Sequence, residues 1–117
     1  MNVGILGSGG REHAICFSIK KSKNVKNIYC LPGNAGTSAI AENIQINISD
    51  FHAIKKFTEE KKIDLLIVGP EKPLVDGIVD FFLDTKVKIF GPNQAASQLE
   101  GSKIFTKKLC EKYNIPT

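Results

Sequence analysis

The chain has 117 residues, which is enough for one small domain and too few for a second catalytic domain. Hydrophobic residues make up 42% and charged residues 24%, and this balance excludes a disordered or fibrous chain. The net charge is +4, but Arg11 is the only arginine and the lysines are scattered along the sequence. Since nucleic-acid surfaces cluster their basic residues and favour arginine, the charge does not indicate a nucleic-acid partner.

The sequence predicts neither a membrane span nor a secretory signal. The longest wholly apolar run, residues 65–68, is far shorter than the roughly 18 residues that a membrane helix needs. The first residues have no basic region followed by a long apolar stretch. Cys16, Cys30 and Cys110 are widely spaced and form no C-x-x-C pair, so we expect buried thiols rather than disulfides or a zinc site. Together these features favour a reducing compartment, the cytoplasm.

Apolar runs and helical patterns alternate through the first half of the chain. Residues 3–6 form a short apolar run, predicted as a strand, before the cluster Gly7-Ser8-Gly9-Gly10, and a helix is predicted over 11–21. A second strand is predicted over 28–31, where Pro32-Gly33 ends it.

The middle of the chain predicts an edge strand and then a helix. Ile44, Ile46 and Ile48 alternate with polar residues, which is typical of a short half-buried strand. A helix is expected over 51–61, with Ser49 or Asp50 as its N-cap.

The second half repeats the alternation. The most apolar strand is predicted over 63–68, and the helical spacing of Val75, Ile78, Val79 and Phe82 predicts an amphipathic helix. A further strand is predicted over 87–90, after which Asn93 can cap a turn and a lysine-rich helix is expected over 102–113. Apolar strands separated by helices indicate a parallel sheet covered on both faces, so the predicted fold is a doubly wound, Rossmann-like α/β domain.

Glycine-bearing loops follow most of the predicted strands. In an open parallel sheet, ligands bind where the carboxyl ends of the strands meet, so we expect these loops to form one shared site. The four loops begin at Gly7, Pro32, Gly69 and Gly91.

The first loop has the features of a phosphate-binding loop at a helix N-terminus. It fails the dinucleotide fingerprint, because Glu12 stands where that motif needs a small residue and Leu31-Pro32 stands where an acid would bind the ribose. It is not a Walker A loop either, since no G-K-[S/T] follows the glycines. We therefore expect it to bind the phosphate of a smaller ligand, with Arg11 adding charge; the alternative is an ordinary tight turn.

Two further residues are candidates for ligand contact. Glu71 follows a strand between two prolines that stiffen its loop, and its carboxylate could accept hydrogen bonds from ribose hydroxyls; it could also be an ordinary exposed glutamate. Asn34 could contact a ligand or bond its own turn. His13 and His52 are far apart in the sequence and no carboxylates cluster, so no metal site is predicted.

Taken together, four sequence blocks resemble the glycinamide ribonucleotide synthetase (phosphoribosylamine–glycine ligase) family of the ATP-grasp superfamily. The resemblance covers the whole chain in order. The blocks are Gly7-Ser8-Gly9-Gly10-Arg11-Glu12-His13-Ala14, Pro32-Gly33-Asn34-Ala35-Gly36-Thr37, Val68-Gly69-Pro70-Glu71 with Pro73-Leu74, and Leu99-Glu100-Gly101-Ser102-Lys103.

The resemblance implies an ATP-driven ligation in purine biosynthesis. In that family ATP phosphorylates the glycine carboxylate, with Mg²⁺ or Mn²⁺ at the nucleotide, and the amine of 5-phosphoribosylamine attacks the acyl phosphate. The fold implied is the pre-ATP-grasp domain, here residues 1–100, with 101–117 as the start of the ATP-grasp portion.

The same resemblance implies a role for each matching residue. Gly9, Gly10 and Arg11 would meet the 5-phosphate, and Glu71 would bind the ribose hydroxyls. Asn34 and Gly36 would line the pocket, while Lys103 would approach the nucleotide phosphates. No catalytic or metal-binding residue of the family is expected within this chain, which we expect to be an amino-terminal part that needs the remaining domains for turnover.

Two other functions stay open at this point. One is a NAD-binding Rossmann module, which the fold and the glycines alone support. The other is a stand-alone phosphosugar-binding protein.

Overall fold

The structure, a computed structural model of the chain, describes residues 1–91. Within these residues the strands are β1 (Asn2–Gly7), β2 (Asn27–Pro32), β3 (Glu42–Asn43), β4 (Leu65–Val68) and β5 (Lys88–Phe90). The helices of the same part are α1 (Gly10–Lys20), α2 (Ala35–Ser38), α3 (Phe51–Glu60), α4 (Glu71–Val75) and α5 (Ile78–Phe81). Asn93, Lys103, Cys110 and the helix expected over 102–113 lie outside the described residues.

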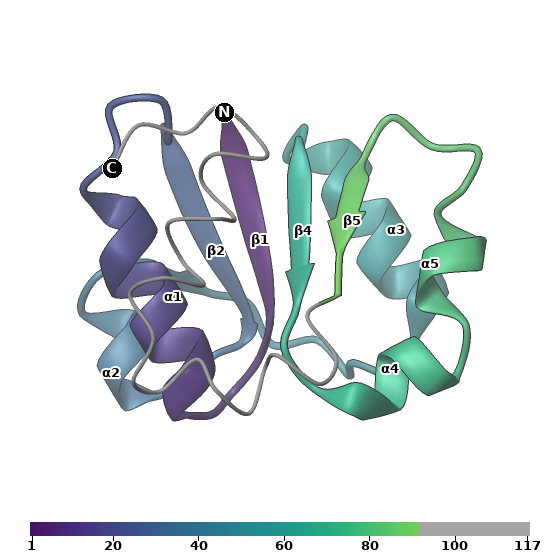
Figure 1. The fold of residues 1–117 in the computed structure, drawn as a ribbon, viewed down its shortest axis with the longest axis horizontal. Helices are drawn as coiled ribbons and strands as arrows, with labels where there is room; N and C mark the ends of the chain where they lie inside the picture. Colours follow the sequence, from purple (N-terminus) through teal and green to yellow (C-terminus); the bar gives the residue numbers. More distant parts are fainter. Residues whose placement is uncertain (92–117) are drawn as a thin grey trace.

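All strands of the sheet run parallel, in the order β3-β2-β1-β4-β5 (Figure 1). The central strand β1 pairs with β2 on one side and with β4 on the other, where Val3 lies opposite Leu65. The chain builds the sheet outwards in one direction and then starts again from β1 in the other, so the switch point lies between β1 and β4. The prediction of a doubly wound, Rossmann-like α/β domain is confirmed.

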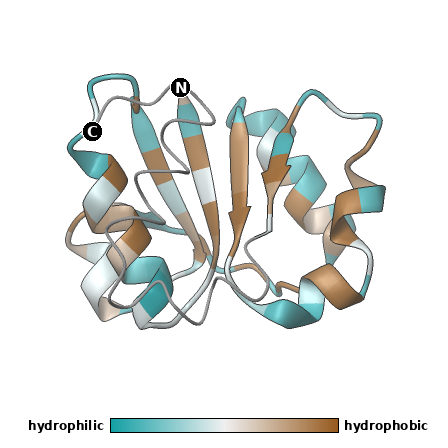
Figure 2. Cartoon of the chain, in the orientation of Figure 1, coloured by the Kyte–Doolittle hydropathy of each residue, from teal (hydrophilic) through white to brown (hydrophobic). Residues whose placement is uncertain are grey.

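Each face of the sheet carries its own hydrophobic core, because successive strand residues point to opposite sides. On one face Val3 and Ile5 of β1 pack with Ile15 and Ile19 of α1. On the other face the core contains residues from α3, α5 and all three central strands: Leu6, Leu31, Ile54, Leu66, Ile78 and Phe82. Figure 2 shows hydrophobic residues concentrated along the central strands, while the helices alternate between hydrophobic and hydrophilic stretches.

The predicted edge strand at Ile44, Ile46 and Ile48 is wrong. The only strand there is β3, which pairs two residues with β2, and the ladder ends after Ile44 N–H donates to the Cys30 carbonyl at 2.8 Å. The three isoleucines are half-buried against the core beneath α3 and α5. The alternation of isoleucines with polar residues arises because one side of an extended segment is buried. An extended segment can be buried in this way without pairing with a neighbouring strand.

The single amphipathic helix predicted around Val75–Phe82 is also wrong, because two short helices replace it. Gly77 has φ +91° and separates α4 from α5. The turn rotates the second helix, so that Ile78 and Phe82 are buried while Val75 and Val79 are 82% and 47% exposed. The four residues match a helical spacing in sequence without sharing one helical face.

The other predicted helices begin close to where the sequence places them. Asp50 is the N-cap of α3, since its carboxylate accepts the Ala53 N–H at 3.1 Å, and Ser49 is not. Helix α1 begins at Gly10, directly after the first glycine loop. It thereby brings its N-terminus to the carboxyl end of β1.

The expectation of buried thiols is confirmed for Cys16 of α1 and Cys30 of β2, which are both free and fully buried. The hydrogen bond with Cys16, together with burial, raises the pKa of the Cys30 thiol. Cys30 is therefore an inert core residue at neutral pH.

Candidate functional site

The loops that follow β1, β2 and β4 lie at one edge of the sheet, the lower edge in Figure 1, where the carboxyl ends of the strands meet. Backbone hydrogen bonds join the loops after β2 and β4 to the end of β1. The Gly33 N–H donates to the Gly7 carbonyl at 3.0 Å, and the Gly69 N–H donates to the Leu6 carbonyl at 3.2 Å. The expectation that these loops converge is met for those three.

The carbonyl groups of the first loop are held by its neighbours. The side-chain amide of Asn34 donates to the Ser8 carbonyl at 2.9 Å and to the Gly9 carbonyl at 3.3 Å. The Gly7 carbonyl is already bonded to Gly33. Within residues 1–91, the backbone N–H groups of Gly10 and Arg11 donate to no protein group, as expected in the first turn of a helix.

The same helical turn carries a positively charged side chain. Arg11 is half-buried in the first turn of α1, and no carboxylate among the described residues forms an ion pair with it. The partial positive charge of the helix N-terminus adds to the guanidinium charge. This end of α1 can therefore bind an anion through backbone N–H groups and one arginine.

The second loop is built rigidly around Asn34 and Thr37. The Asn34 side chain caps α2 by accepting the Thr37 N–H at 2.9 Å, and the Thr37 hydroxyl accepts the Asn34 N–H at 2.8 Å. Asn43 of β3 completes the network, since its amide donates to the Asn34 carbonyl at 2.7 Å. Asn34 thus bonds its own turn, which is one of the two roles predicted from the sequence. It also bonds the first loop, which the sequence did not predict.

Gly36 lies against the first helix. A methyl group at its α-carbon would lie 3.3 Å from the ring of His13, so the glycine lets α2 approach α1 closely. The two glycine loops after β1 and β2 therefore form one connected surface with Gly9 and Gly10 exposed on it.

Glu71 lies at the same edge but in a different local structure from the one predicted. It is the first residue of α4 rather than part of a proline-stiffened loop, and Pro73 fits within the first turn because the N–H it lacks would have no partner there. Glu71 is exposed. It lies on the β4 side of the switch point, whereas α1 follows β1.

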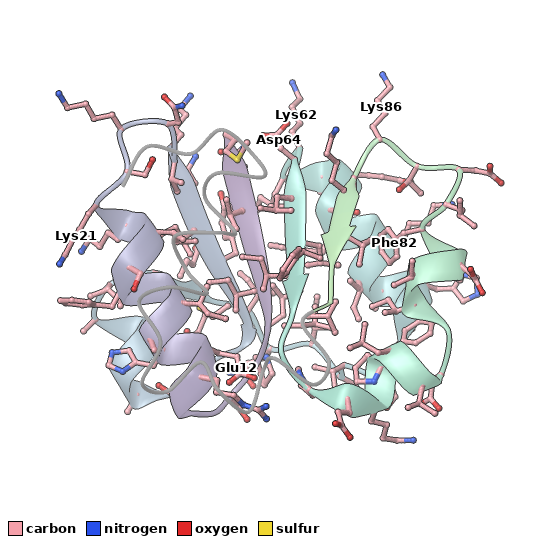
Figure 3. The ribbon with its side chains drawn as sticks, in the orientation of Figure 1. Glu12, Lys21, Lys62, Asp64, Phe82 and Lys86 are labelled. Carbon is pink, nitrogen blue, oxygen red and sulfur yellow. The ribbon has the colours of Figure 1, made fainter. Side chains whose placement is uncertain are left out.

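Glu12 is a site residue that the sequence pattern did not identify as such. The residue is only 3% exposed, and one carboxylate oxygen accepts the Gly9 N–H at 3.2 Å. Figure 3 shows Glu12 at the edge where β1 ends, opposite the edge that carries Lys62, Asp64 and Lys86. The sequence feature that could have identified Glu12 is an acid at the third position of a loop whose first two glycines fit the dinucleotide motif.

Two hollows of the described part lie away from this edge. A cavity of about 620 Å³ is lined by residues of α3 and of the segments before β4 and β5, among them Lys62, Asp64 and Lys86. Another of about 400 Å³ lies beside β2 and β3. The described residues contain no group of three metal-ligating side chains, and none of their helices has the length and apolarity to cross a membrane.

Comparison with known families gives a match to "Phosphoribosylglycinamide synthetase, N domain" over residues 1–100. Two bacterial relatives, both named phosphoribosylamine–glycine ligase, align with the whole chain. The protein from Mesorhizobium japonicum is 53% identical and that from Caldanaerobacter subterraneus subsp. tengcongensis is 50% identical. The chain spans 28% of the length of each of these relatives.

The fold is also similar to a crystal structure of phosphoribosylamine–glycine ligase from Thermotoga maritima. The sequences are 32% identical, and the TM-score is 0.50. The match covers all of this chain and 26% of that one.

Proposed function

Since this chain belongs to the family of phosphoribosylglycinamide synthetase N domains, we propose that it forms the phosphoribosylamine-binding part of a phosphoribosylamine–glycine ligase. The observation that carries the proposal is the first turn of α1, where two unpaired backbone N–H groups lie beside the unpaired Arg11 among the described residues. An anion of one phosphate matches this arrangement in size and charge.

In this proposal the 5-phosphate binds at Gly9, Gly10 and Arg11. The N–H groups of Gly10 and Arg11 donate to phosphate oxygens, and the Arg11 guanidinium adds charge-assisted hydrogen bonds. Asn34 supports this site by holding the Ser8 and Gly9 carbonyls on the opposite side of the loop. Without that bond, carbonyl oxygens could turn towards the phosphate and repel it.

We propose that the ribose binds between the loops after β1 and β4. Glu71, exposed at the start of α4, accepts hydrogen bonds from the ribose hydroxyls. Asn34 and Gly36 border the pocket on the β2 side, where α2 contacts α1. Since the sheet fixes the distance between β1 and β4, the loop that binds the phosphate and the residue that binds the hydroxyls would keep a fixed separation.

The remainder of the reaction belongs to the larger enzyme in this proposal. ATP supplies the phosphoryl group that activates the glycine carboxylate, and Lys103, outside the described residues, approaches the nucleotide phosphates. Residues 1–100 form the phosphoribosylamine-binding domain and 101–117 begin the ATP-grasp portion. We place the enzyme in the cytoplasm and in purine biosynthesis.

The described residues do not fit the Mg²⁺ or Mn²⁺ that the family resemblance implies, because they offer no cluster of three ligating side chains. We therefore assign no metal-binding role to residues 1–91. Their contribution is to bind and orient the phosphoribosylamine.

A titration of the ¹⁵N-labelled chain with ribose 5-phosphate and, separately, with NADH tests this proposal. We expect the phosphosugar alone to shift the amide signals of Gly9, Gly10, Arg11 and Glu71. Arg11→Gln should weaken its binding about tenfold, the loss of one charge-assisted contact. Lys20→Gln removes the same charge at the far end of α1 and should leave binding unchanged.

The proposal fails if NADH shifts these amides and ribose 5-phosphate does not. It fails equally if Arg11→Gln and Lys20→Gln have the same small effect, because the phosphate would then respond only to net charge.

A further inference from the structure

Glu12 is an almost fully buried acid at the switch point of the sheet. The residue is 3% exposed and lies in the first turn of α1, next to the proposed phosphate site. A buried carboxylate so close to an anion site needs an explanation, since its charge opposes binding of the anion.

The contacts of Glu12 show how tightly its carboxylate fills the crevice between β1 and β4. A methyl group at the α-carbon of Gly7 would lie 2.1 Å from Oε1, and one at Gly69 would lie 2.3 Å from the same oxygen. On the other side of the carboxylate, Oε2 accepts the Gly9 N–H at 3.2 Å. Glycine stands at the end of β1 and directly after β4 because the Glu12 carboxylate occupies the space that a side chain would need at Gly7 and Gly69.

The same crevice is where a dinucleotide binds in related folds. In the G-x-G-x-x-G/A fingerprint the second glycine lets the pyrophosphate approach the backbone, and the third small residue lets the helix pack closely on the strand. Gly7 and Gly9 match the first two positions, and Glu12 stands at the third. Here the Gly9 N–H is already bonded to Glu12, and a carboxylate fills the adjoining space.

We infer that Glu12 determines specificity by excluding a pyrophosphate from this crevice, so that a single phosphate binds beside Gly9 through the free N–H groups of Gly10 and Arg11. The inference rests on the proposed function in taking the first loop as the monophosphate site. It adds that one side chain selects a phosphosugar over a dinucleotide. The Glu12 carboxylate fills the crevice and accepts the Gly9 N–H, so neither is available to a pyrophosphate.

The test compares Glu12→Ala with Glu12→Gln in the 117-residue chain. Glu12→Ala completes the fingerprint as Gly7-x-Gly9-x-x-Ala, so we expect NADH to bind at least about tenfold more tightly than to the unsubstituted chain, the worth of one released charge-assisted donor. Glu12→Gln keeps the size of the side chain and an acceptor for the Gly9 N–H. Its affinity for NADH should stay close to that of the unsubstituted chain.

The inference is overturned if folded Glu12→Ala binds NADH no better than the unsubstituted chain, or if both variants gain equally, since exclusion by occupied space would then be wrong. Hydrogen exchange of the unsubstituted chain needs no variant that might fail to fold. We expect the Gly9 amide to exchange more slowly than those of Gly10 and Arg11, and equal rates would contradict its bond to Glu12. If ribose 5-phosphate fails to bind the unsubstituted chain, the proposed function falls, while the NADH and exchange measurements still decide the role of Glu12.

Discussion

At the scale of single residues, Asn34 connects two loops of the proposed site through one side chain. Its carbonyl oxygen caps α2, and its amide group holds two carbonyls of the first loop. The two loops therefore keep a fixed relation to each other. A residue that joins two loops in this way affects both stability and the geometry of the proposed phosphate site.

We predict that Asn34→Ala destabilises the fold by about 1–2 kcal/mol, because it removes an N-cap together with the bonds to the first loop. It should also move the amide signals of Ser8, Gly9 and Gly10. Urea denaturation and an amide spectrum measure the two effects.

Ser38→Ala is the matched control, since Ser38 is an exposed residue of the same helix whose hydroxyl bonds only the nearby Ala35 carbonyl. Its free energy of unfolding should change by no more than about 0.5 kcal/mol. Equal losses in the two variants would show that Asn34 does not connect the loops.

At the scale of elements, the break between α4 and α5 determines which side chains of the two helices pack into the core. Gly77 adopts φ +91°, and this turn directs Ile78 and Phe82 into the core. Both helices are short, so the turn rather than helix propensity fixes their directions.

We predict that Gly77→Ala lowers the free energy of unfolding by about 1 kcal/mol, the cost of a side chain in the left-handed region. A methyl group there would meet no atom within 4 Å, so the loss would come from the backbone alone. Gly77→Asn should lose less, because asparagine tolerates this conformation better. Thermal or urea unfolding of the three proteins checks the order, and equal stability of the alanine variant would refute the argument.

The sequence predicted the elements that depend on local pattern and missed those that depend on partners. The apolar strands and the Asp50 cap follow from neighbouring residues, and these predictions agree with the structure. The broken helix at Gly77 fits an unbroken helical spacing in sequence, so periodicity could not reveal it. The role of Glu12 depends on Gly69, which only the sheet brings beside it.

At the scale of the whole molecule, the described residues form one sheet with the proposed site at a single edge. The loops after β1, β2 and β4 contribute to that edge, and each is fixed by the register of its strand. A site of this kind can bind and orient one substrate. The roles of Gly9, Gly10, Arg11, Asn34, Gly36 and Glu71 in it stay predictions until the titration is done.

We predict that the 117-residue chain alone forms no glycinamide ribonucleotide when it is supplied with phosphoribosylamine, glycine, ATP and Mg²⁺. The reason is that the proposal gives it the binding of one substrate only. Chromatographic detection of the product checks this, with ribose 5-phosphate binding to the same sample as the control for a folded chain. Product above the background without protein would contradict the proposed division of labour.

The central position of β1 has a consequence for how the chain is synthesised. Its first edge pairs with β2, but its second edge waits for β4, because Val3 pairs with Leu65. At ribosomal rates of 5–20 residues per second, that edge stays open for roughly 3–12 s while the intervening residues are made. During this interval the nascent chain presents an apolar strand with unpaired N–H and carbonyl groups, the kind of edge that chaperones shield from aggregation.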